Sequence, residues 1–515
     1  MNRYPLGIQT FEKIREENLF YVDKTDLIYN IVKGSQNNFL SRPRRFGKSL
    51  LVTTMQAYFE GKKDLFKGLA IEKLEKEWVK YPVIHIDLSS GKYYEVQRIM
   101  STLDFLLSRY ELKYDITPRD LSGFGDRFNN IIQTAAAQTG QKVVVLIDEY
   151  DAPMLDSNAK PELQEQIRSI MRDFFSPLKA NEGLLRFVFL TGITKFSQLS
   201  IFSELNNIKN YSLDDEYGAI CGFTQEEILS TFHEGIHEMA KANGLTTEQT
   251  VAKMKEQYDG YRFTPHCPNI YNPYSVLNAL HDKKFSNYWF ATGTPTFLLE
   301  LLIKNDIEMP QLEGIVATED QFDSPTDNIG NPIPVLYQSG YLTIKDYDEG
   351  IYTLGYPNEE VRMGLNRSML NYIAPQYGLK TTAFAAQFRA AMRKDDIDTA
   401  MKVLQSFLAA FPYDIHHNRE DYFQAILFTI FITLGFTIHA EVKTARGRID
   451  LLISTKTTIF VMELKIDQSA EKAMEQIDAK DYTLPYKHDG RRIFKVGINF
   501  STEERTVDEW RYEEA

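Results

Sequence analysis

The sequence is poor in cysteine, in long apolar runs and in net positive charge. It has two cysteines, Cys221 and Cys267, in dissimilar contexts, which argues against a disulfide framework or a zinc site and suits a reducing cytoplasm. No apolar run approaches the length of a membrane span, and the N-terminus lacks the apolar stretch of a signal peptide, so we expect a cytoplasmic protein with no membrane partner. Because the net charge is −13, any nucleic-acid contact must use local basic surface or metal ions.

A glycine is also missing from a loop that usually has one. Residues 42–49 read Arg-Pro-Arg-Arg-Phe-Gly-Lys-Ser between a probable strand and an apolar helix, which is the layout of a phosphate-binding P-loop. The usual first glycine stands five residues before Gly47, and here that position is Arg42. The loop must therefore be entered by another route, with Arg44 or Arg45 reaching the nucleotide or a neighbour. An ordinary surface loop before a helix is the alternative interpretation.

An acidic motif about a hundred residues later favours the P-loop interpretation. Residues 143–147 are apolar and mostly β-branched, which predicts a strand buried on both faces. Asp148 and Glu149 follow at its carboxyl end, where open α/β sheets hold their ligands. Lys48 would then face the terminal phosphates of ATP, while Ser49 and Asp148 would bind Mg²⁺ and Glu149 would orient or deprotonate the attacking water. A strand followed by an acidic turn is the plainer alternative.

Two further apolar strands, at residues 82–87 and 184–192, alternate with helical patterns and predict a parallel sheet with helices on both faces. The second of them ends near Thr191, a candidate sensor of the γ-phosphate. Tyr21 and Phe11 lie upstream of the loop and could stack on adenine, although aromatic side chains more often belong to a core.

We expect three domains from this length and these patterns. Residues 1–225 hold the P-loop motifs. Residues 226–380 show mainly helical patterns and then two short strands, which indicate a helical lid and a winged-helix-like unit. That region either couples the nucleotide state to another event or serves as a structural spacer. Residues 381–515 carry a second group of charged residues inside predicted strands.

In this last domain, residues 447–453 contain Asp450, and residues 458–465 contain Glu463 and Lys465. Glu463 and Lys465 are two positions apart and would project to one face of a strand. Such side chains rarely enter a strand unless they are paired or functional. Two carboxylates that bind Mg²⁺ next to a lysine form the layout of a metal-dependent nuclease. A structural salt bridge of Lys465 with either acid is the alternative.

The chain resembles the bacterial and archaeal family in which an AAA-ATPase-like P-loop domain is fused to a C-terminal domain of the PD-(D/E)XK nuclease superfamily. The stretches that carry the resemblance are residues 21–25, 42–49, 146–151, 258–261, 340–343, 447–450 and 463–465. The form of the loop with arginine in place of the first glycine is that family's own version.

The resemblance implies that Asp450, Glu463 and Lys465 form a nuclease triad, with Gln476 as an accessory residue and Glu420 as an acid on the preceding helix. The residues expected to bind ATP are Arg45, Phe46, Gly47, Lys48, Ser49, Leu50, Asp148 and Thr191. Those expected to act in catalysis are Glu149, Asp450, Glu463, Lys465 and Gln476. Those expected to hold Mg²⁺ are Ser49, Asp148, Asp450 and Glu463.

The expected fold is α/β: a P-loop NTPase parallel sheet, a helical and winged-helix-like middle region and a restriction-endonuclease-like C-terminal domain. The expected function is that of an ATP-binding protein, an ATPase, which regulates a Mg²⁺-dependent nuclease acting on DNA or RNA. Local basic side chains available for nucleic acid are Lys443, Arg446, Arg448, Lys465, Arg491 and Arg492. Two alternatives remain: an ATP-dependent switch whose nuclease-like domain binds without cutting, and a signalling scaffold that forms a homo-oligomer without nucleic acid.

Overall fold

The computed structural model describes residues 3–89, 91–116, 123–157, 160–195, 208–290, 296–305, 307–324, 331–373, 378–408, 427–432, 436–504 and 506–515. The chain forms two compact units. Met1–Thr292 and Gly314–Glu360 make the first unit, and Gly293–Glu313 and Val361–Ala515 make the second. The units therefore divide elsewhere than at residues 225 and 380, and the division into three domains stays a prediction.

The first unit is built on a parallel five-stranded sheet with the order β2-β3-β4-β1-β5. Its strands are β1 (Asn37–Ser41), β2 (Val83–Asp87), β3 (Val143–Asp148), β4 (Leu185–Gly192) and β5 (Lys209–Asn210). All side chains of β1 and β3 are buried, because helices cover both faces of the sheet. The strands predicted from their apolar runs are confirmed, whereas the two-residue β5 has no apolar run and was not predicted.

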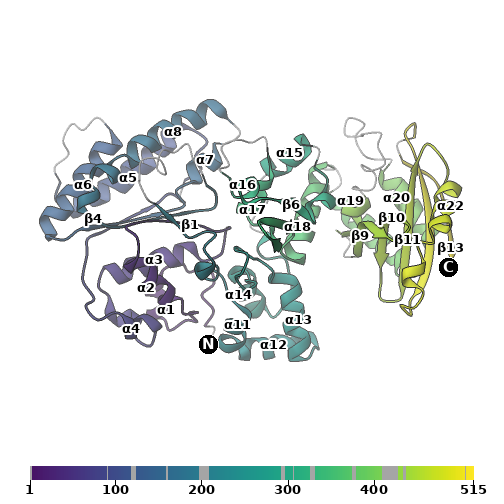
Figure 1. Cartoon of the computed structure of the whole chain (residues 1–515), viewed down its shortest axis with the longest axis horizontal. Helices are drawn as coiled ribbons and strands as arrows, with labels where there is room; N and C mark the ends of the chain where they lie inside the picture. Colours follow the sequence, from purple (N-terminus) through teal and green to yellow (C-terminus); the bar gives the residue numbers. More distant parts are fainter. Residues whose placement is uncertain are drawn as a thin grey trace. The chain divides into compact units, whose positions relative to one another are not determined.

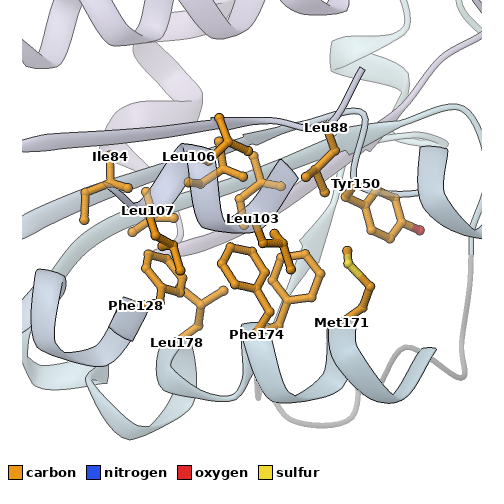
Figure 2. Close-up of a cluster of buried hydrophobic side chains, with 14 of the residues drawn as sticks. Ile84, Leu88, Leu103, Leu106, Leu107, Phe128, Tyr150, Met171, Phe174 and Leu178 are labelled. Carbon is orange, nitrogen blue, oxygen red and sulfur yellow. The ribbon is translucent and has the colours of Figure 1, made fainter. Parts of the chain in front are cut away.

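Helices lie on both faces of this sheet (Figure 1). One face carries α5 (Val96–Lys113), α6 (Phe124–Thr139) and α8 (Pro161–Phe175), and the other carries α3 (Lys48–Phe59) with α1 (Phe11–Glu16), α2 (Thr25–Lys33) and α4 (Ala70–Leu74). Figure 2 shows Phe128 of α6 and Phe174 of α8 among the side chains packed below Ile84 of β2. The two phenylalanine rings stack with their centroids 5.0 Å apart. This core fixes the sheet, and hence the carboxyl ends of its strands.

A second core in the first unit lies among four helices: α11 (Gln225–Thr231), α12 (His233–Asn243), α13 (Thr247–Tyr258) and α14 (Pro273–Asp282). Tyr4 and Phe20, from the N-terminal segment, pack against it. Residues 225–243 form two helices, because the backbone breaks at Phe232, whose φ is −116°. The buried ring of Phe232 contacts Tyr4, Phe20 and Phe223, so burial of this side chain accompanies the break.

The rest of the middle region forms a small antiparallel sheet with the order β6-β8-β7. Its elements are β6 (Ile315–Ala317), α16 (Glu319–Phe322), α17 (Ile333–Gln338), β7 (Thr343–Asp348) and β8 (Ile351–Gly355). The two predicted strands are therefore confirmed and joined by a third.

The second unit contains a mixed five-stranded sheet with the order β13-β12-β11-β10-β9, in which only β11 and β12 run parallel. Its strands are β9 (Thr437–Thr444), β10 (Gly447–Ser454), β11 (Thr458–Ile466), β12 (Arg492–Ser501) and β13 (Thr506–Glu514); its helices are α15 (Thr296–Lys304), α18 (Glu359–Ile373, which begins in the first unit), α19 (Gly378–Met392), α20 (Ile397–Leu408) and α22 (Ala470–Lys480). Helix α22 packs against β11, β12 and β13. Among all described helices of the chain, none is long and apolar enough to cross a bilayer.

Candidate nucleotide and metal sites

The predicted phosphate loop connects the carboxyl end of β1 to the first residue of α3. Gly47 caps α3 with a φ of 95°, a left-handed conformation that glycine adopts without strain. Arg45 also has a positive φ, 66°. The strand, loop and helix expected around residues 42–49 are therefore confirmed, and the N-terminus of a twelve-residue helix follows the loop.

Lys48 and the acidic motif meet at this end of the sheet. The Nζ of Lys48 lies 3.2 Å from Oε1 of Glu149 and donates to the carbonyl of Pro43 at 3.2 Å. Burial, and secondly the charge of Glu149, raise the pKa of Asp148 to about 7, although a hydrogen bond with the Ser49 side chain lowers it. The structure thus brings together the four residues from which the sequence predicted an ATP and Mg²⁺ site.

Two further residues lie at the carboxyl end of β4. The hydroxyl of Thr191, the predicted phosphate sensor, donates to the carbonyl of Leu40 at 2.8 Å, so it is engaged inside the sheet. Asp151 was not singled out from the sequence. Its buried Oδ2 accepts hydrogen bonds from the backbone N–H of Ile193 (2.9 Å) and of Thr194 (2.7 Å), which fixes the segment that follows β4. Its position at the end of the acidic motif was the available signal.

A cavity of about 470 Å³ opens beside the loop, and this volume is typical of ligand pockets. Its lining comes mainly from residues 5–9, 20–22, 44–51 and 220–223, and includes Lys24, Glu149 and Tyr274. The predicted residues Arg45, Leu50 and Tyr21 are part of this lining. Phe11 is not in the lining: it is fully buried in the core, where its ring contacts Tyr21 with the centroids 5.1 Å apart.

The loop is enclosed on its other side by segments from far along the sequence. The buried ring of Phe46 contacts the rings of Tyr261 (4.7 Å between centroids) and Phe263 (5.3 Å). Trp289 donates from its indole nitrogen to the carbonyl of Arg44 at 3.0 Å. A Cβ atom on Gly340, whose φ is +86°, would lie 2.7 Å from the Cβ of Pro43. This enclosure was not predicted, although residues 258–261 and 340–343 were among the stretches that carry the family resemblance.

The second unit holds the predicted nuclease residues on β10 and β11. Leu451 lies opposite Met462 in this antiparallel pair, so the next positions along the two strands, Asp450 and Glu463, belong to one face. Oδ2 of Asp450 accepts a hydrogen bond from the backbone N–H of Leu464 at 2.8 Å. The strand pairing expected for a shared metal site is present.

The side chains around Glu463 complete this group. Glu463 is 1% exposed, and its Oε1 lies 3.2 Å from the Nζ of Lys465. The same oxygen accepts a hydrogen bond from the amide nitrogen of Gln476 on α22. Lys465 also donates to the carbonyl of Leu464 at 2.9 Å. Four of the five predicted residues therefore gather around two strands and one helix, and the fifth, Glu420, lies outside the described residues.

The predicted basic side chains of this unit are mostly engaged by carboxylates. Arg446 contacts Asp481, Arg448 contacts Glu441, Arg491 contacts Asp489, and Arg492 contacts both Asp395 and Glu514. Residues 361–515 contain as many basic as acidic side chains, so the whole net charge of −13 comes from residues 1–360.

Within the described part of the chain, no three His, Cys, Asp or Glu side chains cluster as a metal site. Mg²⁺ needs fewer than three such protein ligands, because it keeps several waters and is commonly bound by one or two carboxylates.

Comparisons with known proteins match two parts of the chain to known families. Residues 5–202 match a family described as predicted AAA-ATPase, and residues 418–510 match the PD-(D/E)XK nuclease superfamily. The chain is 32% identical over 519 residues to the uncharacterized protein in the vnfD 5′ region of Azotobacter chroococcum mcd 1, with 98% of each chain covered.

Distant structural likenesses were found to several solved structures, among them an ORC2 protein and Cdc6p. The Aeropyrum pernix ORC2 protein, in ADPNP and ADP complexes, is 10% identical with a TM-score of 0.26, over 67% of this chain and 93% of that one. Cdc6p from Pyrobaculum aerophilum is 10% identical with a TM-score of 0.24, over 70% of this chain and 94% of that one.

Proposed function

This chain belongs to the family of AAA-ATPase-like proteins that carry a C-terminal PD-(D/E)XK nuclease-superfamily domain, and from that premise we propose that it binds and hydrolyses ATP to regulate a Mg²⁺-dependent nuclease acting on DNA or RNA. The observation that carries the nucleotide half is the meeting of Lys48, Ser49 and Asp148 beside a cavity of about 470 Å³. The nuclease half rests on Asp450 and Glu463, which share one face of the β10–β11 pair.

In the nucleotide site, the backbone N–H groups of the loop and of the first turn of α3 would bind the phosphates of ATP. The ammonium group of Lys48 would leave Glu149 and contact the terminal phosphates, because these carry more negative charge than one carboxylate. Glu149, released from Lys48, would accept a proton from the attacking water or orient that water. Lys48 would thus exchange Glu149 for the phosphates, so that phosphate binding releases Glu149 to act as the base.

In the nuclease site, Lys465 would stabilise the negative charge that develops on the phosphodiester or position the attacking water. The amide of Gln476 would hold Glu463 in one orientation through its hydrogen bond. Asp450 is oriented from the other side by the N–H of Leu464. These two contacts would keep the carboxylates fixed before the substrate arrives.

The residues at both sites fit Mg²⁺ by their donor chemistry. Oδ1 of Asp148 is buried without a hydrogen-bond partner among the described residues, and the Ser49 hydroxyl lies beside this carboxylate. Asp450 and Glu463 supply carboxylate oxygens, which this hard cation prefers. Bound Mg²⁺ would neutralise the phosphates at the first site and polarise a phosphate and a water at the second.

A cleavage assay tests the proposal. Plasmid and single-stranded DNA and RNA are incubated with Mg²⁺ or Mn²⁺, with and without ATP, using the wild type, Asp450→Ala and Lys48→Ala. The proposal requires metal-dependent cleavage that Asp450→Ala abolishes, and a response to ATP that Lys48→Ala abolishes. Cleavage by Asp450→Ala at the wild-type rate would contradict the nuclease assignment, and ATP hydrolysis by Lys48→Ala would contradict the nucleotide site.

A second function is favoured by the ion pairs of the second unit. Arg446, Arg448, Arg491 and Arg492 are each occupied by carboxylates, which leaves less basic surface for phosphate groups than the sequence indicated. A signalling scaffold that forms a homo-oligomer without nucleic acid is therefore the alternative. Absence of nucleic-acid binding in a filter assay, together with no cleavage under any metal, would identify it.

We also propose that the protein is cytoplasmic. Cys221 and Cys267 are both free thiols and both buried. Free thiols persist in reducing compartments, which supports a cytoplasmic location.

A further inference from the structure

Arg42, which stands where a standard P-loop has its first glycine, is one of the most completely buried charged residues of the first unit. It is 2% exposed, and its guanidinium carbon lies 4.4 Å from the centre of the Phe263 ring. Its Nη1 donates to the carbonyls of Ser41 and Ser212, both at 2.9 Å, and its Nη2 donates to the carbonyl of Tyr217 at 3.1 Å. The side chain therefore joins the entry of the loop to the segment that follows β5.

Burying this charge is costly, and its surroundings compensate only in part. Among the ion pairs of the described residues none involves Arg42, so backbone carbonyls and one aromatic face are its partners. Burial lowers the pKa of this guanidinium, yet arginine stays protonated in proteins. A glycine would avoid the desolvation cost, which indicates that the arginine meets a requirement of the loop.

The bonds of Arg42 bear directly on the phosphate-binding atoms. Its backbone N–H donates to the carbonyl of Gly192 at 3.1 Å, which continues the pairing of β1 with β4. The next residue, Pro43, accepts a hydrogen bond from the Nζ of Lys48 at 3.2 Å. The segment on the far side is fixed in turn, because the Ser212 hydroxyl accepts from the N–H of Ser41 at 2.9 Å. A displacement of Arg42 would therefore shift the loop backbone against Lys48.

We propose that Arg42 is a positioning residue for the nucleotide: its guanidinium ties the entry of the phosphate loop to residues 212–217 and so gives the loop the shape that the first glycine gives in standard P-loops. The planar fork of arginine suits this task, since one side chain donates to three carbonyls on two chain segments. Lysine carries the same charge but cannot reproduce that geometry. This inference rests on the proposed nucleotide site and adds that the affinity for ATP depends on a residue outside the lining of the cavity.

The test compares Arg42→Gly, which restores the standard residue, with Arg42→Lys, which keeps the charge. Arg186→Lys is the matched control, because Arg186 also donates to a backbone carbonyl, that of Val32, and lies over the ring of Tyr81 in the same unit. Binding of a fluorescent ATP analogue and the thermal midpoint are measured for each full-length protein. Loss of charge-assisted hydrogen bonds predicts ATP affinity at least about tenfold weaker in both Arg42 variants and unchanged in the control.

Chemical rescue separates positioning from a general loss of packing. Guanidinium ion at concentrations far below those that denature should enter the space vacated in Arg42→Gly and restore part of its ATP affinity, while Arg42→Lys should not respond. ATP binding by Arg42→Gly within about twofold of the wild type would overturn the inference, as would a rescue that Arg42→Lys shares. If an Arg42 variant does not fold, Phe263→Leu is used, which removes the ring that lies against Arg42 and also against Phe46. This variant must show the same weakening, and wild-type affinity in it overturns the inference as well. Failure of the wild type itself to bind ATP would instead refute the proposed function.

Discussion

The ammonium group of Lys48 lies 3.2 Å from the carboxylate of Glu149, so the cation expected to bind the phosphates and the base expected to activate water neutralise each other. Both side chains are largely removed from solvent, with 3% and 18% of their surfaces exposed, which strengthens this attraction relative to a surface pair. ATP has to compete with Glu149 for Lys48. The pair is thus a contact that nucleotide binding would break.

Replacement of Glu149 by glutamine should separate binding from hydrolysis. Glu149→Gln frees Lys48 from its ionic partner, so we expect ATP to bind as tightly as in the wild type or a few-fold more tightly, with hydrolysis reduced by about a hundredfold or more because the base is lost. Calorimetry with ATP and a phosphate-release assay measure the two effects. Glu162→Gln, at the exposed start of α8, is the control. Weaker ATP binding by Glu149→Gln would show that the Lys48 pair does not compete with phosphate.

Gly340 should influence nucleotide binding without touching the nucleotide. In Gly340→Ala the new methyl group would lie 2.7 Å from the Cβ of Pro43, so either the loop or the segment of Gly340 has to move. Gly350→Ala is a matched control, because its φ is +92° but nothing lies within 4 Å of its Cβ. Both variants should lose about 1–2 kcal/mol of stability through backbone strain. Only Gly340→Ala should weaken ATP binding, by about tenfold, in a titration with a fluorescent analogue. Equal ATP affinities for the two variants would mean that the contact of Gly340 with Pro43 does not change the conformation of the phosphate loop.

Gln476 should matter to the nuclease site through Glu463. Gln476→Ala removes the hydrogen bond to Glu463 and should lower metal-dependent cleavage by about tenfold and raise the Mg²⁺ concentration at half-maximal rate. Gln476→Glu places a second carboxylate against Glu463 and should lower cleavage further. Glu475→Ala, exposed on the same helix, serves as the control. Chelation of the metal should stop cleavage in every variant. An unchanged Mg²⁺ dependence in Gln476→Ala would contradict the orienting role.

The raised pKa of Glu360 predicts that the stability of the protein depends on pH. Burial raises its pKa to about 7, although hydrogen bonds from the Ser275 hydroxyl (2.6 Å) and the N–H of Trp289 (2.7 Å) oppose the rise. The unfolded chain releases this proton near pH 4.5, so between about pH 4.5 and 7 the folded state binds more protons than the unfolded one. The contribution of Glu360 to stability therefore falls as the pH rises through this window and is constant above it.

The matching variant is Glu360→Gln, which carries no charge at any of these pH values. From pH 5 to pH 8 the wild type should lose on the order of 1–3 kcal/mol relative to this variant. The difference is measured from the thermal midpoints of both proteins at each pH. Midpoints that change in parallel would show that Glu360 titrates as an ordinary surface acid.

The sequence motifs by themselves were sufficient to predict the family, the parallel P-loop sheet and the nuclease-like strands. Apolar runs such as residues 143–147 and 459–462 indicate burial on both faces, which is a local property of the chain, and the structure confirms these strands. Helix caps are local as well: Thr224 and Thr246 both form capping boxes where α11 and α13 begin. The two-residue strand β5 carries no such pattern, because its pairing with β1 defines it.

The chemistry-bearing residues were therefore recognisable from the sequence, since each needs a particular residue type at a particular place on a strand or loop. What only the tertiary structure decided is what surrounds them. Arg42 is joined to residues 212–217, Phe46 to Tyr261 and Phe263, and Pro43 to Gly340, over separations of more than 150 residues. Such contacts depend on how separate segments pack, and the local sequence does not specify which distant residue a buried side chain will contact.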